Sequence, residues 1–335
     1  MSVSVLIPAH NEEKWLDRTI RNIFDTAQGD IEVCVVLNGY DQEVDPRVKV
    51  LRYQENTGER VAMNTAAHMA RGTHLLRIDA HCDFSPDGWD VMMEEATGEK
   101  DVTVAVLTAV DKEWNRIPGH WYGFCRLLPN MEAKWQKPNI NKAIYKTIEP
   151  NMAFTGCGFM LRKDFYWEIG GADESLPKMG AIGEEFAVKA WLAGGKVQTR
   201  TDVMIGHIFD TGGYGEEGVL EARKALVEKY GDRYEEIRAK FPDFDTSEPM
   251  RPTGHKAAGV RTVIVTRTDT EETKDGNVLI RRRVRKFRYV WVETEHPEEK
   301  TWTDEQIREK YAPMGKQIDE QTFLANDKGE LQAVA

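Results

Sequence analysis

The chain has 335 residues, of which 41% are apolar and 30% charged, and its net charge is −11 at neutral pH. A chain of this size and composition can bury one large core and a smaller appendage, so we expect one or two globular domains. The negative charge argues against a protein that binds nucleic acid over its whole surface, and no run approaches the roughly 18 apolar residues of a membrane span.

Two features predict a cytoplasmic location. The apolar segment Val3–Ile7 opens the chain in place of a charged leader and an apolar signal core. The cysteines are widely scattered and form no Cys-x-x-Cys pair, which fits a reducing compartment better than a disulfide framework. They are Cys34, Cys82, Cys125 and Cys157.

The first hundred residues alternate strand and helix patterns. Apolar segments predict strands at Val3–Ile7, Ile31–Leu37, Val48–Tyr53 and His74–Ile78. The spacing of apolar residues predicts helices around residues 15–24 and at Arg60–Met69. This alternation predicts the α/β class, with a mostly parallel, doubly wound sheet flanked by helices.

Asp79 and His81 directly follow the fourth predicted strand. Ligands of open α/β sheets bind at the carboxyl ends of the strands, which is where these two side chains lie. A carboxylate and a neutral imidazole suit Mn²⁺ better than Mg²⁺, and they leave coordination positions open for phosphate oxygens. The alternative is a helix cap and a solvated loop residue. Downstream, His207 lies on a second apolar segment and is either a third ligand or a hydrogen-bonded core histidine.

Two later segments carry further candidates. Gly156 and Gly158 interrupt a strand-like stretch, as expected either where backbone passes close to a ligand or at a β-bulge. Glu184 and Glu185 stand at the start of a predicted helix, where consecutive carboxylates complement the helix dipole or take part in proton transfer. The glycine-rich stretch 210–215 has the composition of a mobile flap.

The pattern changes after residue 215, and we expect three parts. They are a catalytic domain at 1–215, a helical connector at 216–255 and a β-rich module at 256–335. In the last part, Val260–Arg267 and Leu279–Val292 alternate like strands and are joined across Asp275–Asn277 as a long hairpin.

The second strand of this predicted hairpin is strongly basic. Its cationic residues are Arg281, Arg282, Arg283, Arg285, Lys286 and Arg288. Aromatic residues alternate with some of them, a combination that suits the phosphate backbone of a nucleic acid. The alternative is a solvated edge strand whose charges prevent aggregation.

Several short motifs follow one another in order along residues 1–210. They are Ile7-Pro8-Ala9-His10-Asn11-Glu12, Asn56-Thr57-Gly58 with Asn64, Ile78-Asp79-Ala80-His81-Cys82, Gly156-Cys157-Gly158-Phe159-Met160, Ile169-Gly170-Gly171-Ala172-Asp173, Gly183-Glu184-Glu185 and Gly206-His207-Ile208-Phe209. The set resembles the glycosyltransferases of family 2 type with the GT-A fold. Asp-x-His followed by Cys is closest to the polypeptide N-acetylgalactosaminyltransferases, because most other relatives have Asp-x-Asp.

The resemblance implies a metal-dependent transfer of a sugar. By analogy, Asp79, His81 and His207 would hold Mn²⁺, or Mg²⁺, against the diphosphate of a nucleotide sugar, with a UDP-sugar as the expected donor. Glu184 would contact the donor sugar, and Glu185 would take the proton from the attacking hydroxyl. The residues expected around the donor are Pro8, His10, Glu12, Asn38, Arg60, Asn64, Asp79, Gly156 and Gly158.

The sequence departs from the family pattern in two places. Leu37 stands where relatives usually offer an acidic residue to the base, so Asn38 or Asp41 takes over those hydrogen bonds or the segment is simply an Asn-Gly turn. The Asp-x-His motif resembles retaining enzymes, whereas the tandem carboxylates resemble inverting ones. Because of the second carboxylate, we expect the transfer to invert the configuration of the sugar.

The acceptor is predicted from the part of the chain beyond the catalytic motifs. No match to the β-trefoil of the secreted relatives is found, and the basic strand suits nucleic acid, so we expect a hydroxymethylated pyrimidine base in DNA, as in phage DNA modification in the host cytoplasm. The other acceptors considered are a protein Ser or Thr and a soluble glycan. A non-catalytic module that binds nucleotide sugars is the alternative of another class, although all three metal-ligand candidates are present.

Overall fold

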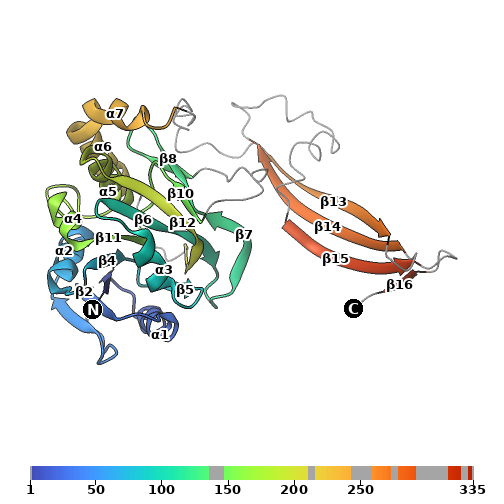
Figure 1. Cartoon of the computed structure of the whole chain (residues 1–335), viewed down its shortest axis with the longest axis horizontal. Helices are drawn as coiled ribbons and strands as arrows, with labels where there is room; N and C mark the ends of the chain where they lie inside the picture. The colour runs from blue at the N-terminus through green and yellow to red at the C-terminus, as the bar shows by residue number, and fades with distance from the viewer. Residues whose placement is uncertain are drawn as a thin grey trace. The chain divides into compact units, whose positions relative to one another are not determined.

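The structure is a computed structural model of the whole chain (Figure 1). It describes residues 2–135, 147–209, 216–242, 259–272, 278–291, 316–325 and 331–333. The chain divides into two compact units, Met1–Glu248 and Pro249–Ala335. The predicted flap at 210–215 and the hairpin turn at Asp275–Asn277 lie outside the described residues.

The first unit is built on a mixed sheet. Its strands are β1 (Val3–Ala9), β2 (Ile31–Asn38), β3 (Lys49–Tyr53), β4 (His74–Arg77), β5 (Cys82–Ser85), β6 (Asp101–Val110), β7 (Arg116–Tyr122), β10 (Ile148–Pro150), β11 (Phe159–Arg162) and β12 (Lys196–His207). The main order is β10-β12-β6-β11-β4-β1-β2-β3, and a separate short pair joins β8 (Cys125–Leu127) to β9 (Ala133–Trp135). Strands β4, β1, β2 and β3 pair in parallel, whereas β11 runs antiparallel to both of its neighbours.

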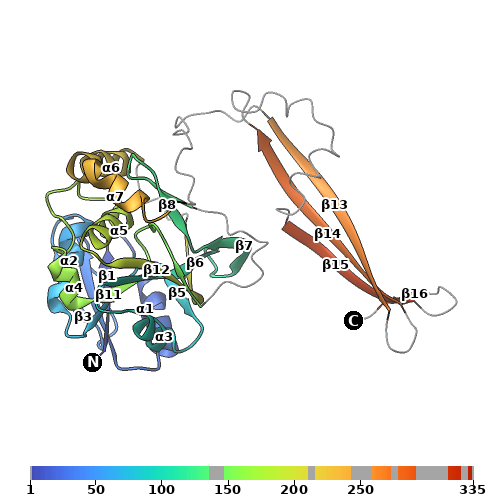
Figure 2. The same ribbon diagram turned by 45° about the horizontal axis from the view of Figure 1, so that its top comes forward.

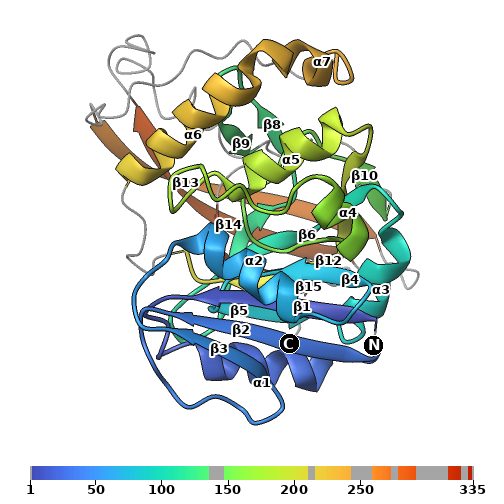
Figure 3. The ribbon, with the colours of Figure 1, turned by 90° about the vertical axis from the view of Figure 1, so that its left-hand side faces the viewer.

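Helices cover both faces of this sheet. They are α1 (Leu16–Thr26), α2 (Glu59–Met69), α3 (Trp89–Ala96), α4 (Lys163–Glu168), α5 (Ile182–Leu192), α6 (Glu216–Tyr230), the 3₁₀ turn Gly231–Arg233 and α7 (Tyr234–Arg238). Figure 3 shows α1 on one side of the sheet and α2 and α5 on the other. The predicted α/β class with a mostly parallel sheet flanked by helices is therefore confirmed.

Alternating side chains give the sheet two hydrophobic cores. On β1, Leu6 packs into the core beneath α2 and α5, whereas Val5 and Ile7 pack into the core beneath α1 and α3. Strand β2 alternates in the same way, with Val36 on the first face and Val35 on the second. A strand buried on both faces has a nearly continuous apolar sequence, which is why these segments could be found from the sequence.

The predicted strands and helices of the first hundred residues lie close to those observed. The predicted strand at Ile31–Leu37 is β2, and the predicted helix at Arg60–Met69 is α2, which begins one residue earlier. The parallel strands β1 and β4 both end at the edge where Asp79 follows. Topology therefore places Asp79 and His81 at the edge where α/β proteins bind their ligands.

Helices α6 and α7, in the predicted connector, belong to the first unit and lie beside α5 (Figure 2). The Tyr234 hydroxyl of α7 donates to the carbonyl of Leu127 at 2.9 Å, and Arg223 of α6 binds Glu184. The division into three parts stays a prediction, but these contacts tie residues 216–242 to the rest of the first unit.

The second unit contains one sheet of order β13-β14-β15-β16. Its strands are β13 (Gly259–Glu272), β14 (Val278–Trp291), β15 (Lys316–Ala325) and β16 (Leu331–Ala333). Strands β13 and β14 pair antiparallel over their whole length, as the alternation predicts. The basic strand β14 also pairs with β15, so it is an interior strand of this sheet. Among the described residues, no helix is long and apolar enough to cross a membrane.

Candidate metal and donor site

Three predicted ligands converge at the carboxyl edge of the sheet. One ligand atom from each of Asp79, His81 and His207 lies within 4.8 Å of the others, although the third residue is 126 positions or more from the first two along the chain. His207 Nε2 is 2.9 Å from Asp79 Oδ2, and the two imidazole rings lie 4.7 Å apart. A carboxylate and two imidazoles at this separation form a donor set suited to a borderline divalent cation.

The backbone around these ligands is held by a buried threonine of α1. Thr19 Oγ1 donates to the carbonyl of Ala80 at 2.8 Å, and it accepts from the amide of Cys82 at 3.0 Å. One hydroxyl thus fixes both sides of His81. No short-range sequence pattern identifies this contact, because Thr19 is only one of several polar residues on the α1 sequence.

Asp79 is also held by an arginine that the sequence reasoning missed. Arg77 Nη2 lies 2.7 Å from Asp79 Oδ1 and also binds Glu59, and Arg77 Nη1 donates to the carbonyl of Gly156. Arg77 is almost completely buried. The only sequence signal for it is a cation inside an otherwise apolar strand, and a buried cation requires an anionic partner nearby.

Glu12 contacts His81 in this structure. Its two carboxylate oxygens lie 3.1 and 3.0 Å from His81 Nδ1. Because a carboxylate only accepts, the proton of the neutral ring sits on Nδ1 and the lone pair sits on Nε2. This is the carboxylate–histidine arrangement that orients imidazole ligands of metals.

Burial and neighbouring charges set the protonation of the three ligands. Burial alone would raise the pKa of Asp79, but Arg77 and His207 hold it well below its usual range. Burial lowers the pKa of His207 below its ordinary value. Against the effect of burial, the Glu12 carboxylate raises the pKa of His81. An ionised Asp79 and a neutral His207 are the forms that bind a cation.

Asn38, one of the two residues predicted to contact the base, forms hydrogen bonds within the neighbouring loop. The Asn38 amide nitrogen donates to Asn56 Oδ1 and to the Gly58 carbonyl, each at 3.1 Å, and its oxygen accepts from Thr57. His10 Nδ1 bonds the Asn38 carbonyl at 2.6 Å, next to Pro8 at the end of β1. The side chain of Asn38 therefore acts here as the turn-forming residue that the alternative interpretation describes. Asp41 is exposed and pairs with Arg52.

Arg60 and Asn64 bind partners outside the metal-ligand cluster. Arg60 is buried, with Nε 2.9 Å from Glu185 Oε2 and Nη2 donating to the Gly180 carbonyl. Asn64 bonds Ala172 through both its amide nitrogen and its oxygen. Both side chains have these partners already, so the structure does not bring them to the donor edge in this arrangement.

The two glycines lie beside the ligand cluster, and each has a geometric reason to be glycine. Gly158 has φ +76°, and a Cβ there would lie 2.9 Å from Ile205 Cδ1. A Cβ on Gly156 would lie 3.2 Å from Ile182 Cβ, at the start of α5. The glycines thus let the chain before β11 pass close to both β12 and α5.

The tandem carboxylates have different environments. Glu184 accepts from the Ala133 amide at 3.3 Å and pairs with Arg223 at 3.1 Å, and its burial raises its pKa. Glu185 is fully buried, and its oxygens bind Arg60, Lys189 and the Asp173 amide. Both oxygens of Glu185 are thus engaged in a buried network between α2 and α5.

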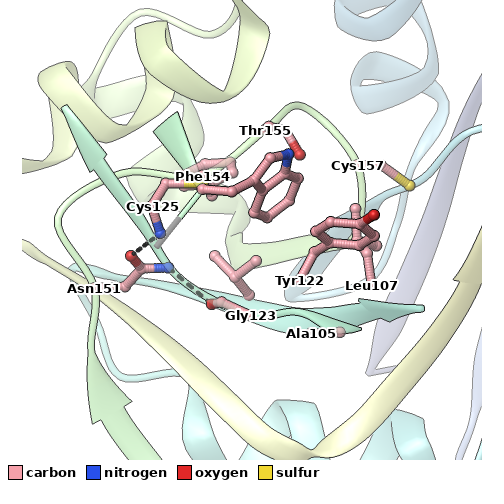
Figure 4. Close-up of a pocket in the computed structure, with 11 residues that line it drawn as sticks. Ala105, Leu107, Tyr122, Gly123, Cys125, Asn151, Phe154, Thr155 and Cys157 are labelled. Atoms are coloured by element: carbon pink, nitrogen blue, oxygen red, sulfur yellow. Dashed lines mark hydrogen bonds between the residues drawn. The ribbon is translucent and has the colours of Figure 1, made fainter. Parts of the chain in front are cut away.

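A hollow with room for about one water molecule lies beside Gly156 and Gly158 (Figure 4). Its wall includes Tyr122, Phe154 and Cys157, which come from β7 and from the segment before β11. Asn151 closes the floor by bonding the Cys125 amide and the Gly123 carbonyl, as the dashed lines in Figure 4 show. The lining is mostly apolar.

This α/β sheet, with an Asp-x-His motif at its carboxyl edge, has the architecture of a GT-A glycosyltransferase domain. Residues 4–170 match the model of the family described as "Glycosyl transferase family 2". The chain belongs to this family of enzymes, as the motifs predicted.

Known relatives share this region at low identity. Human polypeptide N-acetylgalactosaminyltransferase 10 is 22% identical over 228 residues, which cover 62% of this chain and 38% of that protein. Mouse N-acetylgalactosaminyltransferase 7 is 27% identical over 212 residues, covering 56% and 32%. A crystal structure of GalNAc-T7 with UDP, GalNAc and Mn²⁺ superposes with a TM-score of 0.61 at 23% identity, covering 70% of this chain and 49% of that one. The chain spans less than half the length of these relatives, and the structural likeness establishes a shared fold.

Proposed function

We propose that this protein transfers a glycosyl unit from a nucleotide sugar to a hydroxyl acceptor, with Mn²⁺ or Mg²⁺ held by Asp79, His81 and His207. The observation that carries the proposal is the convergence of these three ligand atoms within 4.8 Å at the carboxyl edge of the sheet. The donor set fits the cation, since it combines one carboxylate with two imidazoles, one of which Glu12 orients through Nδ1.

The bound metal would act as a Lewis acid that stabilises the negative charge on the departing diphosphate. Arg77 keeps Asp79 ionised and fixed, because the guanidinium binds its Oδ1 at 2.7 Å. Glu12 keeps the proton of His81 on Nδ1 and so presents Nε2. These groups are positioned before the donor arrives, and the site therefore needs little reorganisation during the reaction.

The proposed donor is a UDP-sugar. Support comes from the solved relative GalNAc-T7, whose crystal structure contains UDP, GalNAc and Mn²⁺. In this chain, Gly156 and Gly158 let the backbone approach the donor sugar beside the hollow, and Glu184 lies at the start of α5 close to the same segment. The buried ion pairs of Glu185 favour a bracing role for it over that of the base, so the preference for inversion no longer has structural support.

A donor screen tests this proposal. The full chain is incubated with Mn²⁺ and a panel of UDP-sugars, and UDP release is measured. In the folded fraction, as determined by urea unfolding, Asp79→Asn and His207→Gln are expected to lose turnover, whereas His68→Gln, at an exposed position on α2, is expected to keep it and serves as the matched control. Undiminished turnover in both site variants would refute the assignment of the ligands, and nucleotide-sugar binding without any turnover would instead identify a non-catalytic module.

For the acceptor, we propose a hydroxymethylated pyrimidine base in DNA, in a cytoplasmic setting. The support is the run of six basic residues on β14 (Arg281, Arg282, Arg283, Arg285, Lys286 and Arg288), an electrostatic pattern suited to phosphate contacts. The register also pairs Arg281 with Asp269 and Arg283 with Glu320, so acidic residues accompany part of this run. A protein Ser or Thr is the competing acceptor, since the curated relatives are named as polypeptide transferases.

Labelled-donor transfer distinguishes these acceptors. Hydroxymethylated DNA, unmodified DNA and a Ser/Thr peptide are offered in parallel, and DNA affinity is measured against salt. Neutralising Arg281, Arg282 and Arg283 is expected to weaken DNA binding and flatten its salt dependence, since each lost phosphate contact reduces the slope by about one. Neutralising the exposed Arg233, Arg238 and Lys240 removes the same charge elsewhere and is the control. Transfer to the peptide alone would overturn the DNA assignment.

A further inference from the structure

Two cysteines and a histidine form a second cluster next to the metal ligands. Cys82 Sγ lies 3.5 Å from Cys157 Sγ, and ligand atoms of Cys82, Cys157 and His207 all lie within 4.8 Å of one another. Cys82 begins β5 and is the register partner of His207 on β12, whereas Cys157 lies between the two glycines before β11. Both thiols are buried and free. The proposed sugar transfer uses neither of them.

The separation of the sulfurs fits tetrahedral zinc. With Zn–S bonds of about 2.3 Å, two thiolates on one tetrahedral ion lie about 3.7 Å apart. The observed 3.5 Å is within a few tenths of an ångström of that value. A zinc ion therefore requires almost no movement of the two sulfurs relative to each other.

His207 supplies a buried nitrogen as the third donor. Its Nε2 is 2.9 Å from the ionised carboxylate of Asp79, so in the neutral ring Nε2 carries the proton and Nδ1 carries the lone pair. Nδ1 is buried and has no hydrogen-bond partner among the residues that the structure describes. A buried acceptor without a partner is costly, and it marks a place suited to a ligand.

We propose that Cys82 Sγ, Cys157 Sγ and His207 Nδ1 form a site for a thiophilic divalent cation of the zinc class. As the two zinc–sulfur bonds form, each thiol releases its proton to water, and a water molecule fills the fourth position. Two thiolates and one imidazole select a soft or borderline ion, whereas the oxygen of Asp79 serves the harder ion of the neighbouring site.

Occupation of this site removes one ligand, His207, from the catalytic position. A neutral imidazole has one lone pair, so zinc on Nδ1 keeps the proton on Nε2, which faces Asp79. His207 then cannot bind the metal held by Asp79 and His81. The two sites share one ligand and compete for it, which makes zinc an inhibitor of manganese binding.

The wild-type chain tests the site without any mutation. Zinc is added at one equivalent to the reduced full chain, and X-ray absorption counts the neighbours of the ion. Two sulfur neighbours at about 2.3 Å are expected. Only nitrogen and oxygen neighbours would overturn the proposal, because the ion would then occupy the Asp79, His81 and His207 site.

Cobalt substitution assigns the sulfurs to individual residues. Thiolate-bound Co²⁺ gives a sulfur-to-metal charge-transfer absorption, which is expected to disappear in Cys82→Ser and in Cys157→Ser. Cys34→Ser and Cys125→Ser, at the two other buried free cysteines, are matched controls that keep it. Retention of the absorption in both site variants would exclude these sulfurs as ligands.

The Asp79→Asn variant tests the cysteine site independently of the proposed function. In that variant manganese binding is expected to be lost while the cobalt–sulfur absorption remains, so failure of either site is visible alone. In the wild type, saturating zinc is expected to weaken manganese binding by a factor in the range of about 5–150. Undiminished manganese affinity in zinc-saturated protein would contradict the shared use of His207.

Discussion

Arg77 and Asp79, two residues apart at the end of one strand, form a buried ion pair with 2.7 Å between Nη2 and Oδ1. The same guanidinium reaches Glu59 at the start of α2 and the carbonyl of Gly156 before β11. One cation therefore joins a proposed metal ligand, a helix and the glycine segment before β11. The geometry of the site depends on this residue as much as on the ligands themselves.

Replacing Arg77 by methionine is expected to weaken both folding and metal binding. The change leaves the carboxylates of Asp79 and Glu59 buried without their cation, and breaking a buried pair in this way costs roughly 3–5 kcal/mol. Urea unfolding measures the loss, and titration with Mn²⁺, followed by its electron spin resonance, measures the affinity.

An exposed ion pair provides the control for Arg77. Arg52 pairs with Asp41 at 2.6 Å, but both side chains are largely in solvent, so Arg52→Met is expected to change stability by at most about 1 kcal/mol. Equal losses in Arg77→Met and Arg52→Met would contradict the role given to burial. Unaltered Mn²⁺ affinity in a folded Arg77→Met protein would show that Asp79 binds the ion without being positioned by Arg77.

The pH dependence of manganese binding is expected to report on Glu12. Burial lowers the pKa of His81, but the Glu12 and Asp79 carboxylates together more than offset this, and the pKa lies above its ordinary value of 6.5. The imidazolium therefore forms already above pH 6.5 as the solution is acidified, and manganese is displaced there. In Glu12→Gln the pKa of His81 falls, so binding is expected to persist to lower pH, although its strength at neutral pH drops by roughly 10–100-fold.

Glu13→Gln is the matched control, because Glu13 is the exposed neighbour of Glu12. Its manganese titration is expected to follow the wild-type pH curve. If the curve of Glu12→Gln also coincides with that of the wild type, the contact of 3.0 Å between Glu12 and His81 Nδ1 does not control the ligand.

Local patterns predicted most of the first unit and marked Asp79 and His81 as candidate metal ligands. Strands β1, β2 and β4 are buried on both faces, so their apolar runs were visible, and parallel pairing brings their carboxyl ends to one edge. The convergence of His207 with Asp79 depended on the family resemblance, because no local pattern relates residues so far apart in the chain.

The sequence could not separate residues that touch the donor from residues that support the site. Arg60 and Asn64 are polar residues on α2 and were expected near the donor, yet both bond to the segment before α5. Arg77 lies within an apolar segment, so the sequence did not indicate its partners. Cys82 and Cys157 are 75 residues apart, so the sequence did not indicate that their sulfurs are neighbours. Each of these assignments depends on long-range side-chain contacts, which hydrophobic periodicity does not encode.

Gly158 is expected to tolerate alanine much less well than Gly170. Both have positive φ, +76° and +83°, so each substitution incurs a backbone penalty of roughly 1–2 kcal/mol. At Gly158 the new Cβ would also lie 2.9 Å from Ile205 and 3.3 Å from Leu107, whereas no described atom lies within 4 Å at Gly170. Overpacking adds roughly 1–3 kcal/mol at Gly158 alone. Urea unfolding of the two variants measures the difference, and equal stabilities would refute the close approach.

Glu185→Ala and Glu184→Ala are expected to differ in stability although the residues are adjacent. Removing Glu185 leaves Arg60 and Lys189 buried without an anion, at a cost of roughly 3–5 kcal/mol. Removing Glu184 frees Arg223, whose side chain is 22% exposed and can regain water, so the loss is smaller. Urea unfolding of the two variants measures this difference.

Turnover measurements further distinguish the structural role of Glu185 from the proposed donor-sugar contact of Glu184. Glu185→Gln is expected to lower stability and to keep the metal affinity of the folded fraction, because the ion pairs of Glu185 join α2 to α5 and do not reach the metal ligands. Glu184→Gln is expected to lower turnover with a smaller effect on unfolding, since the proposed contact is with the donor sugar. A Glu185→Gln protein that unfolds like the wild type but has no turnover would support the catalytic base as the role of Glu185. A purely structural role requires that the substitution lowers stability.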